Sequence, residues 1–306
     1  MERRIYVGDV TMKQARGLSG ESLSFRQKIE LAKLLDKLGV SVIESAPLRN
    51  GKSDSLLVKS LASAIKDSVL AVPVEIMDPA SVQVTWNALC GAAHPRMQVC
   101  VPVSTVQMEY LCHRKPADIL GLISSQVSAC AALCPEVEFV AEDFGRSDPA
   151  FLADAVAAAT GAGAGIVTVC DAAGNLLPDE FHASVAEVRR ILPEGVRLGV
   201  YCSNLMFQAD SCAIAAVRAG ADEVKTMPYG NITVSLKRFV KILDAKSDLC
   251  RARSSVRVID LDRTVERIKV LCEARSSKSS NHSRDWTSTG RHSPSRSTMT
   301  VMPCSR

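Results

Sequence analysis

Several features are scarce in this chain of 306 residues, and each scarcity argues against a class of protein. The formal net charge is only +4, so the folded part gives no reason to expect nucleic acid or a membrane as a partner. No apolar run is long enough to cross a bilayer, and the initial Met-Glu-Arg-Arg is not followed by a signal-like apolar segment. We therefore expect a cytoplasmic protein.

The chain has eleven cysteines, but it lacks the paired cysteine spacing of a zinc site. They are spread through apolar segments such as that around Cys212, so most are interpreted as small core residues. The closest pair, Cys130 and Cys134, lies one helical turn apart without a partner pair, which disfavours a metal site. Cys170 and Cys202 fall near expected strand ends, yet no neighbouring histidine supports a reactive thiol.

Short apolar strands recur at intervals of about thirty residues, and helix-period segments lie between them. This alternation predicts consecutive βαβ units in an α/β fold. Eight strands are expected, centred on Ile5–Val7, Ser41–Ile43, Val69–Val74, Met97–Val103, Val137–Val140, Gly165–Val169, Leu198–Tyr201 and Glu223–Thr226. Amphipathic helices are expected at Ser24–Leu38, Asp54–Ile65, Ala117–Cys130, Pro149–Thr160, Pro178–Ile191 and Ala209–Ala219.

Eight such units match the size of a (β/α)₈ TIM barrel, and a doubly wound open sheet is the alternative. We expect the barrel over residues 1–247 and a short C-terminal extension, with one charged helix, over 248–273. Residues 274–306 are rich in Ser, Arg and Thr with almost no apolar periodicity, which predicts a disordered tail. A tail that contacts RNA and a frameshifted terminus are the two alternatives to a plain solvated end.

The site of such a barrel lies at the carboxyl ends of its strands, where polar residues gather in this sequence. Carboxylates that converge there with a lysine suit proton abstraction next to a carbonyl, or the binding of a carboxylate substrate. Asp9 has an equally good interpretation as a turn residue. We predict Lys13 and Glu142 as catalytic residues, and Asp9, Glu44, Gln107, Thr168, Asp171 and Asn231 as substrate-binding residues.

Five segments resemble one enzyme family: Asp9–Pro47, Ser104–Tyr110, Val137–Pro149, Thr168–Pro178 and Arg197–Asn231, which ends with Gly230-Asn231. The first reads DVTMKQARG and is followed by LGV and IE, which resembles the opening of the acyl-CoA condensing and cleaving barrels. These include 2-isopropylmalate synthase, homocitrate synthase and hydroxymethylglutaryl-CoA lyase, with pyruvate carboxyltransferase-like barrels. The resemblance implies a TIM barrel, a 2-oxoacid and possibly an acyl-CoA as substrates, and a homodimer.

The resemblance also implies a divalent metal (Mg²⁺, Mn²⁺ or Zn²⁺), yet most of its ligand positions are replaced. Gln14 stands at the family's Asp position, and Tyr201 and Ser203 stand at its two His positions. Asn231 matches the last ligand. Neutral Gln and Ser oxygens and a protonated Tyr hydroxyl are poor ligands, so we expect no metal at these positions.

Other departures change the charge of the motif. The family's arginine is Lys13 here, which keeps the charge and loses the bidentate fork, and its acidic residue is Arg16. Three hypotheses follow: a transferase or lyase with a degenerate metal site, a silent or regulatory barrel that binds a carboxylate, and a metal-independent lyase. The third uses Lys13 as a Schiff-base nucleophile, which requires a lowered pKa. Arg16 favours that shift, and Asp9 and Glu44 oppose it.

Overall fold

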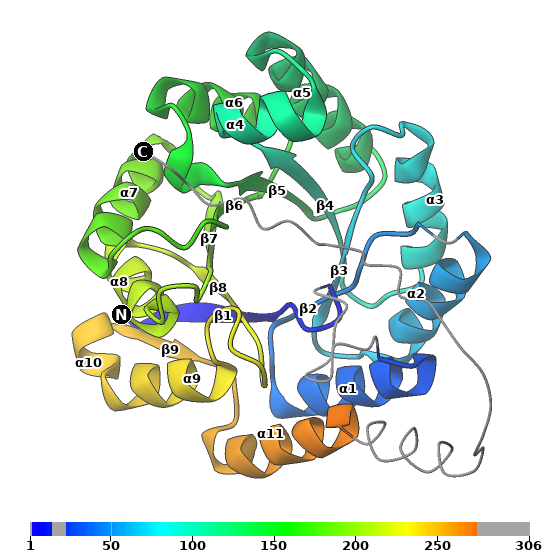
Figure 1. The fold of residues 1–306 in the computed structure, drawn as a ribbon. Helices are drawn as coiled ribbons and strands as arrows, with labels where there is room; N and C mark the ends of the chain where they lie inside the picture. Colours follow the sequence, from blue (N-terminus) through cyan, green and yellow to red (C-terminus); the bar gives the residue numbers. More distant parts are fainter. Residues whose placement is uncertain (1, 14–22, 50, 274–306) are drawn as a thin grey trace, which may run out of the picture. The chain divides into compact units, whose positions relative to one another are not determined.

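The computed structural model describes residues 2–13, 23–49 and 51–273. Eight parallel strands follow one another in the order β2-β3-β4-β5-β6-β7-β8-β1, and the pairing of β1 with β2 closes the ring (Figure 1). This closure confirms the TIM barrel and excludes the open sheet. The strands are β1 (Arg3–Asp9), β2 (Val42–Glu44), β3 (Val69–Pro73), β4 (Pro95–Pro102), β5 (Val137–Glu142), β6 (Ile166–Asp171), β7 (Arg197–Cys202) and β8 (Glu223–Thr226).

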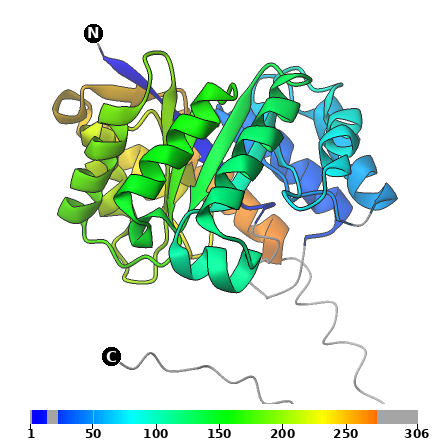
Figure 2. The same cartoon turned by 90° about the horizontal axis from the view of Figure 1, so that it is seen from above.

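Helices surround the strands on the outside of the barrel (Figure 2). The longer ones are α1 (Phe25–Leu38), α2 (Lys52–Ala64), α3 (Ala80–Leu89), α5 (Pro116–Ala131), α6 (Pro149–Gly161), α7 (Pro178–Ile191), α8 (Ala209–Ala219) and α9 (Leu236–Ala245). All eight expected strands and all six expected helices are present, and α7, α8 and β8 have the expected bounds. Short turns α4 (Thr105–Gln107), η1 (Met108–Cys112) and η2 (Phe144–Arg146) lie in the loops after β4 and β5.

Local sequence explains where the helices begin and end. At α1, Ser24 and Gln27 form a reciprocal capping box, and Gly39 ends the helix in the left-handed region at φ 87°. Ahead of α6, the Asp148 side chain accepts a hydrogen bond from the backbone N–H of Phe151. These caps fix the ends of the helices whose apolar faces cover the barrel.

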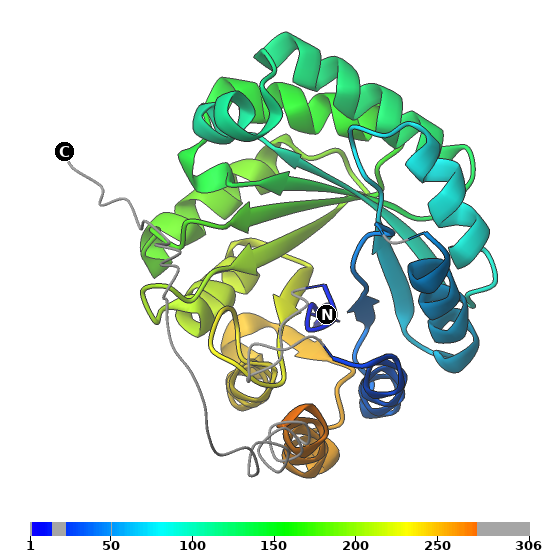
Figure 3. The same cartoon turned by 45° about the vertical axis from the view of Figure 1, so that its right-hand side comes forward.

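The segment after α9 packs onto the barrel. It contains α10 (Ser247–Cys250), β9 (Ala252–Ser254) and α11 (Val258–Glu273), and β9 pairs in parallel with the first residues of β1. Helix α11 lies beside α1 (Figure 3) and buries Leu261, Val265 and Ile268. The described residues, up to Glu273, form one compact unit. The predicted disordered tail, 274–306, lies outside the described residues.

Two further expectations concern single features of the chain. The ten cysteines in the described part of the chain are all free, and six of them are buried, as expected for small core residues. Among the described helices, none has the length and apolarity needed to cross a bilayer.

Candidate functional site at the carboxyl ends of the strands

A cluster of ionised side chains fills the interior of the barrel. The Nζ atom of Lys225 lies 2.6 Å from Glu44 Oε1, 2.8 Å from Glu138 Oε1 and 2.5 Å from Glu223 Oε1. All four residues are buried. Burial alone lowers the pKa of Lys225, but the attraction of Glu138, Glu223 and Glu44 outweighs it and raises that pKa. Lys225 is therefore an ammonium ion held in a cage of three carboxylates.

Arg96 supplies a second buried cation to the same cluster. Its Nη1 lies 3.0 Å from Glu138 Oε2 and 2.9 Å from Glu223 Oε1. Gln98 Nε2 donates to Glu138 Oε2 at 2.9 Å, and the Thr168 hydroxyl donates to Glu138 Oε1 at 2.6 Å. Burial opposes ionisation of Glu138, but Lys225 and Arg96 outweigh it and hold its pKa well below the usual range. The cluster is charged but internally neutralised.

Lys13 connects this cluster to the mouth of the barrel. Its Nζ lies 3.0 Å from Glu44 Oε2, donates to Gln98 Oε1 at 3.2 Å and contacts Cys100 Sγ at 3.7 Å. Burial lowers the pKa of Lys13, but the electrostatic effects of Cys100, Glu44 and Glu138 exceed that effect and raise it. Lys13 is therefore positively charged. Its long contact with sulfur is the weakest of the three, so a ligand oxygen can replace it at least cost.

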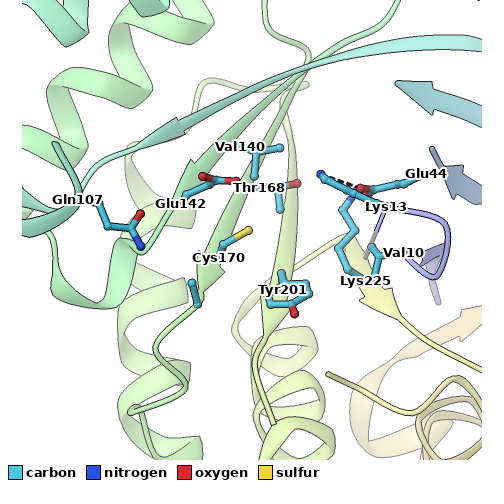
Figure 4. A pocket seen from close by; sticks show the side chains of 11 residues that line it. Val10, Lys13, Glu44, Gln107, Val140, Glu142, Thr168, Cys170, Tyr201 and Lys225 are labelled. Atoms are coloured by element: carbon cyan, nitrogen blue, oxygen red, sulfur yellow. Dashed lines mark hydrogen bonds and ion pairs between the residues drawn. The ribbon is translucent and has the colours of Figure 1, made fainter. Parts of the chain in front are cut away.

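The cavity beside Lys13 has a volume of about 290 Å³. Figure 4 shows Lys13 with Glu44 on one side of it and Glu142 with Gln107 on the other. Burial raises the pKa of Glu142, which the charge of Lys13 partly offsets. A carboxyl group with a raised pKa beside an ammonium suits proton transfer at a substrate carbon or oxygen. The other lining residues are Val10, Val140, Thr168, Cys170, Ala172, Tyr201 and Lys225.

A second cavity, of about 640 Å³, adjoins the first. Lys13 and Glu142 line both cavities. Lys28 and Arg49 line only the second one, and Arg49 donates to Glu75 at 2.7 Å. The pair that faces the small cavity is therefore also open to a larger space, whose lining carries Asp54 and Glu75 as well as Lys28 and Arg49.

Five of the eight predicted site residues meet at the small cavity: Lys13, Glu44, Gln107, Glu142 and Thr168. The other three lie outside its lining. The carboxylate of Asp9 accepts hydrogen bonds from the backbone N–H and the hydroxyl of Thr11, which matches the turn interpretation. Asp171 Oδ1 accepts the backbone N–H of Gly174, and Asn231 Oδ1 accepts the side-chain amide of Asn204. These three fix loops at the mouth.

Asp9 is fully buried, and among the described residues it has no ion-pair partner. Burial is the main cause that raises its pKa to about 7, and the charge of Glu44 adds to it, against the hydrogen bonds from Thr11. Asp9 is therefore partly protonated near neutral pH, unlike the carboxylates of the central cluster.

Sequence reasoning missed the residues of the central cluster: Arg96, Gln98, Glu138, Glu223 and Lys225. A signal for them exists. Charged or amide residues stand two positions apart in β4 and in β8, within otherwise apolar strands. Since alternate residues of a strand face the same side, each pair must point together into the barrel.

The residues that stand at the family's metal positions do not fit a metal well. Burial raises the pKa of Tyr201 to about 12, so its hydroxyl stays protonated. The side-chain oxygen of Asn231 is already hydrogen-bonded to Asn204, and Gln14 lies outside the described residues. The predicted absence of a metal stays a prediction.

Three carboxylates elsewhere do lie close enough together to hold a metal ion. They are those of Glu44, Glu138 and Glu223, whose nearest oxygens lie within 4.8 Å of one another. The ammonium of Lys225 contacts all three, so a cation would have to displace Lys225 to bind there. As the chain stands, the three carboxylates are balanced by three cations, those of Lys225, Arg96 and Lys13.

The fold and this cavity define a TIM barrel with a polar site at the carboxyl ends of its strands, where such barrels carry their chemistry. A family model described as HMGL-like matches residues 4–231. The chain belongs to this HMGL-like family.

The similar proteins are synthases and lyases. The chain is 28% identical to 2-isopropylmalate synthase of Pyrococcus abyssi over 88% of this chain and 56% of that protein. It is 30% identical to the Clostridium kluyveri enzyme of the same name over 74% of this chain and 44% of that protein. The chain thus spans about half the length of the curated relatives it matches.

Solved structures of the same fold are more distant in sequence. The HMG-CoA lyase of Brucella melitensis superposes with a TM-score of 0.72 at 13% identity, covering 89% of this chain and 98% of that one. The carboxyl transferase domain of Rhizobium etli pyruvate carboxylase, in a structure with pyruvate, has a TM-score of 0.66 at 16% identity. That match covers 89% of this chain and 48% of the other.

Proposed function

We propose that this chain is a transferase or lyase that forms or breaks a carbon–carbon bond between a 2-oxoacid and an acyl-CoA. The observation that carries the proposal is the position of Lys13 and Glu142, which face each other across one cavity and also line the larger one beside it. The small cavity suits the oxoacid. We place the acyl-CoA in the larger one, where Lys28 has no carboxylate partner among the described residues and Arg49 is paired with Glu75.

In the condensing direction, a base removes a proton from the carbon next to the thioester carbonyl. The resulting carbanion bonds to the ketone carbon of the oxoacid, and the ketone oxygen takes up a proton. We assign the movement of a proton to Glu142, because burial raises the pKa of its carboxyl group and so makes it a stronger base than an exposed carboxylate. The ammonium of Lys13 stabilises the negative charge that develops on the ketone oxygen.

A divalent metal would polarise the same carbonyl if one were bound. The replaced positions Tyr201 and Ser203 offer poor ligands, so we infer that Lys13 takes over the task of charge stabilisation. A Schiff base at Lys13 is disfavoured, because its raised pKa leaves little of the neutral amine that such a mechanism requires. A homodimer and a cytoplasmic location stay predictions.

A barrel that binds a carboxylate without turnover is the second candidate. The observation that favours it is that Lys13 already has an ion-pair partner in Glu44, so it neutralises charge without any substrate. Under this second hypothesis, Lys13 binds the carboxylate of the ligand and Glu142 transfers no proton.

Calorimetry and a turnover assay distinguish these candidates. Pyruvate and longer 2-oxoacids are titrated with and without acetyl-CoA, and the products of C–C bond formation are followed by mass spectrometry. We expect Lys13→Met to lose oxoacid binding by about tenfold or more. Glu142→Gln should retain binding and lose turnover by about a hundredfold or more.

Lys33→Met, a change on the exposed face of α1, is the matched control and should behave as the unmodified protein. Oxoacid binding without product in any assay would assign the chain to the silent barrels. Equal binding by Lys13→Met and the unmodified protein would remove both candidates.

A further inference from the structure

A third cavity, of about 720 Å³, lies at the end of the barrel opposite the site. Arg3 and Arg197, the first residues of β1 and β7, line it, which places it at the amino ends of the strands. Figure 1 shows α8 and α10 beside the start of the chain. Five arginines line the cavity together with a single carboxylate: Arg3, Arg189, Arg197, Arg218, Arg251 and Asp222.

Two of the arginines share that carboxylate and are fixed by backbone oxygens. Arg189 Nη1 lies 3.0 Å from Asp222 Oδ2 and donates to the carbonyl of Val196 at 3.2 Å. Arg3 Nη1 lies 3.6 Å from Asp222 Oδ1, and its Nη2 donates to the carbonyl of Val217 at 2.5 Å. One negative charge is therefore divided between two guanidinium groups that the fold holds in position.

The remaining three arginines differ in their partners. Arg197 stacks over the ring of Tyr6, at 4.6 Å from its centroid, and pairs with Glu136. Arg218 and Arg251 are exposed, and their guanidinium groups make no hydrogen bond or ion pair with any residue of the described ranges. The cavity thus carries an excess of positive charge that these parts of the chain do not neutralise.

We propose that this cavity binds a small molecule with a phosphate or diphosphate group. Guanidinium groups bind phosphate oxygens through paired hydrogen bonds, and two of them are free of protein partners in the described structure. The volume lies in the range of small-molecule sites, and the concave shape suits a compact anion. Val196 and Leu249 add apolar wall for the organic part of the ligand.

This site is separate from the proposed chemistry, because the carboxyl ends of the strands lie at the other end of the barrel. A bound anion would neutralise charges carried by β1, α8 and the turn after α10 together. We therefore expect binding to stabilise the fold and to leave residues such as Lys13 untouched.

Titration of the full chain with inorganic pyrophosphate at low salt tests the proposal. We expect saturable one-to-one binding in calorimetry, a rise in melting temperature, and weakening as potassium chloride increases. Arg218→Gln with Arg251→Gln should weaken binding by about tenfold or more. ADP, which carries the same diphosphate, should bind at least as tightly if the apolar wall contributes.

The matched control is Arg190→Gln with Arg263→Gln, which removes the same charge from exposed positions that are 74% and 78% accessible. This control should bind pyrophosphate within about twofold of the unmodified protein. Equal weakening in both double variants, or the absence of saturable binding to the unmodified protein, would overturn the proposal. Tighter and length-dependent binding of an RNA oligonucleotide would overturn it as well.

Discussion

The two charged regions at the centre and at the amino end of the barrel differ in balance and in burial. In the central cluster, Lys225 and Arg96 are buried, and each contacts Glu138 and Glu223. At the amino end, five arginines and one aspartate line an open cavity, and only two of the arginines pair with that aspartate. The charges of the first region are paired with one another, whereas part of the positive charge of the second region has no partner among the described residues.

This difference follows from the free energy of desolvation. An ion inside the barrel loses its hydration, so it is tolerated only with partners of opposite charge at contact distance. An arginine at the rim keeps its water and tolerates the lack of a partner at small cost. Balanced buried charge is therefore a requirement of the fold, whereas unbalanced accessible charge is available for a ligand.

The largest effect is expected from breaking the balance of the central cluster. Lys225→Met leaves three carboxylates close together with one cation fewer, and it should lower the free energy of unfolding by about 3–5 kcal/mol. Denaturant unfolding at pH 7 measures the change. Lys237→Met, which breaks an exposed ion pair with Asp262, is the control and should cost less than about 1 kcal/mol. Similar losses in both variants would show that burial does not govern these charges.

A second experiment on the same cluster tests whether a metal ion can take the place of the Lys225 ammonium. Lys225→Ala opens space between the three carboxylates, whose geometry then suits a divalent cation. We expect Mn²⁺ to raise the melting temperature of Lys225→Ala and to leave the unmodified protein unchanged. If Mn²⁺ stabilises both proteins equally, it binds elsewhere and the cage does not explain the effect.

Asp9 sharpens the comparison, because it is buried and has no ion-pair partner among the residues that the structure describes. Its pKa is about 7 in the folded state against 3.8 when exposed, so the folded state holds a proton that the unfolded chain releases between these values. The free energy of unfolding should therefore fall as pH rises from about 4 to 7. In Asp9→Asn, the free energy of unfolding should fall over this pH range by roughly 2–4 kcal/mol less than in the unmodified protein. The measurement is the free energy of unfolding of both proteins at each pH.

Asp262→Asn provides a contrast of opposite sign. The pKa of Asp262 is lowered by its contacts with Lys237 and Lys241. Ionised Asp262 stabilises the fold at pH values above the pKa that it has in the unfolded chain. This contribution is lost as the pH falls through the lower pKa that it has in the folded state. A pH dependence of the same sign in both variants would contradict the assignment for Asp9.

The smallest effect is expected at the amino end. Arg218→Gln with Arg251→Gln removes two accessible cations that repel their neighbours, so without ligand it should raise the free energy of unfolding by a few tenths of a kcal/mol at low salt. The gain should vanish at high salt. A loss above about 1 kcal/mol would show that these arginines hold the fold together.

Much of this molecule is readable from local pattern. The bounds of β8, α7 and α8 follow from apolar periodicity and capping, and five predicted site residues meet at one cavity because strand ends converge in a barrel. Asp9 and Asp171 end β1 and β6, and Asn231 lies in the loop after β8, yet their side chains are hydrogen-bonded to Thr11, Gly174 and Asn204. Position along the chain does not show which way such a side chain turns.

The sequence by itself determined the alternation of strands and helices, because periodicity is a property of neighbouring residues. Only the tertiary structure decided that Glu138 of β5 and Lys225 of β8 lie 2.8 Å apart, and that Arg3 and Arg189 share Asp222. These contacts join residues far apart in the chain, and they depend on the closure and register of the barrel, which no single segment encodes.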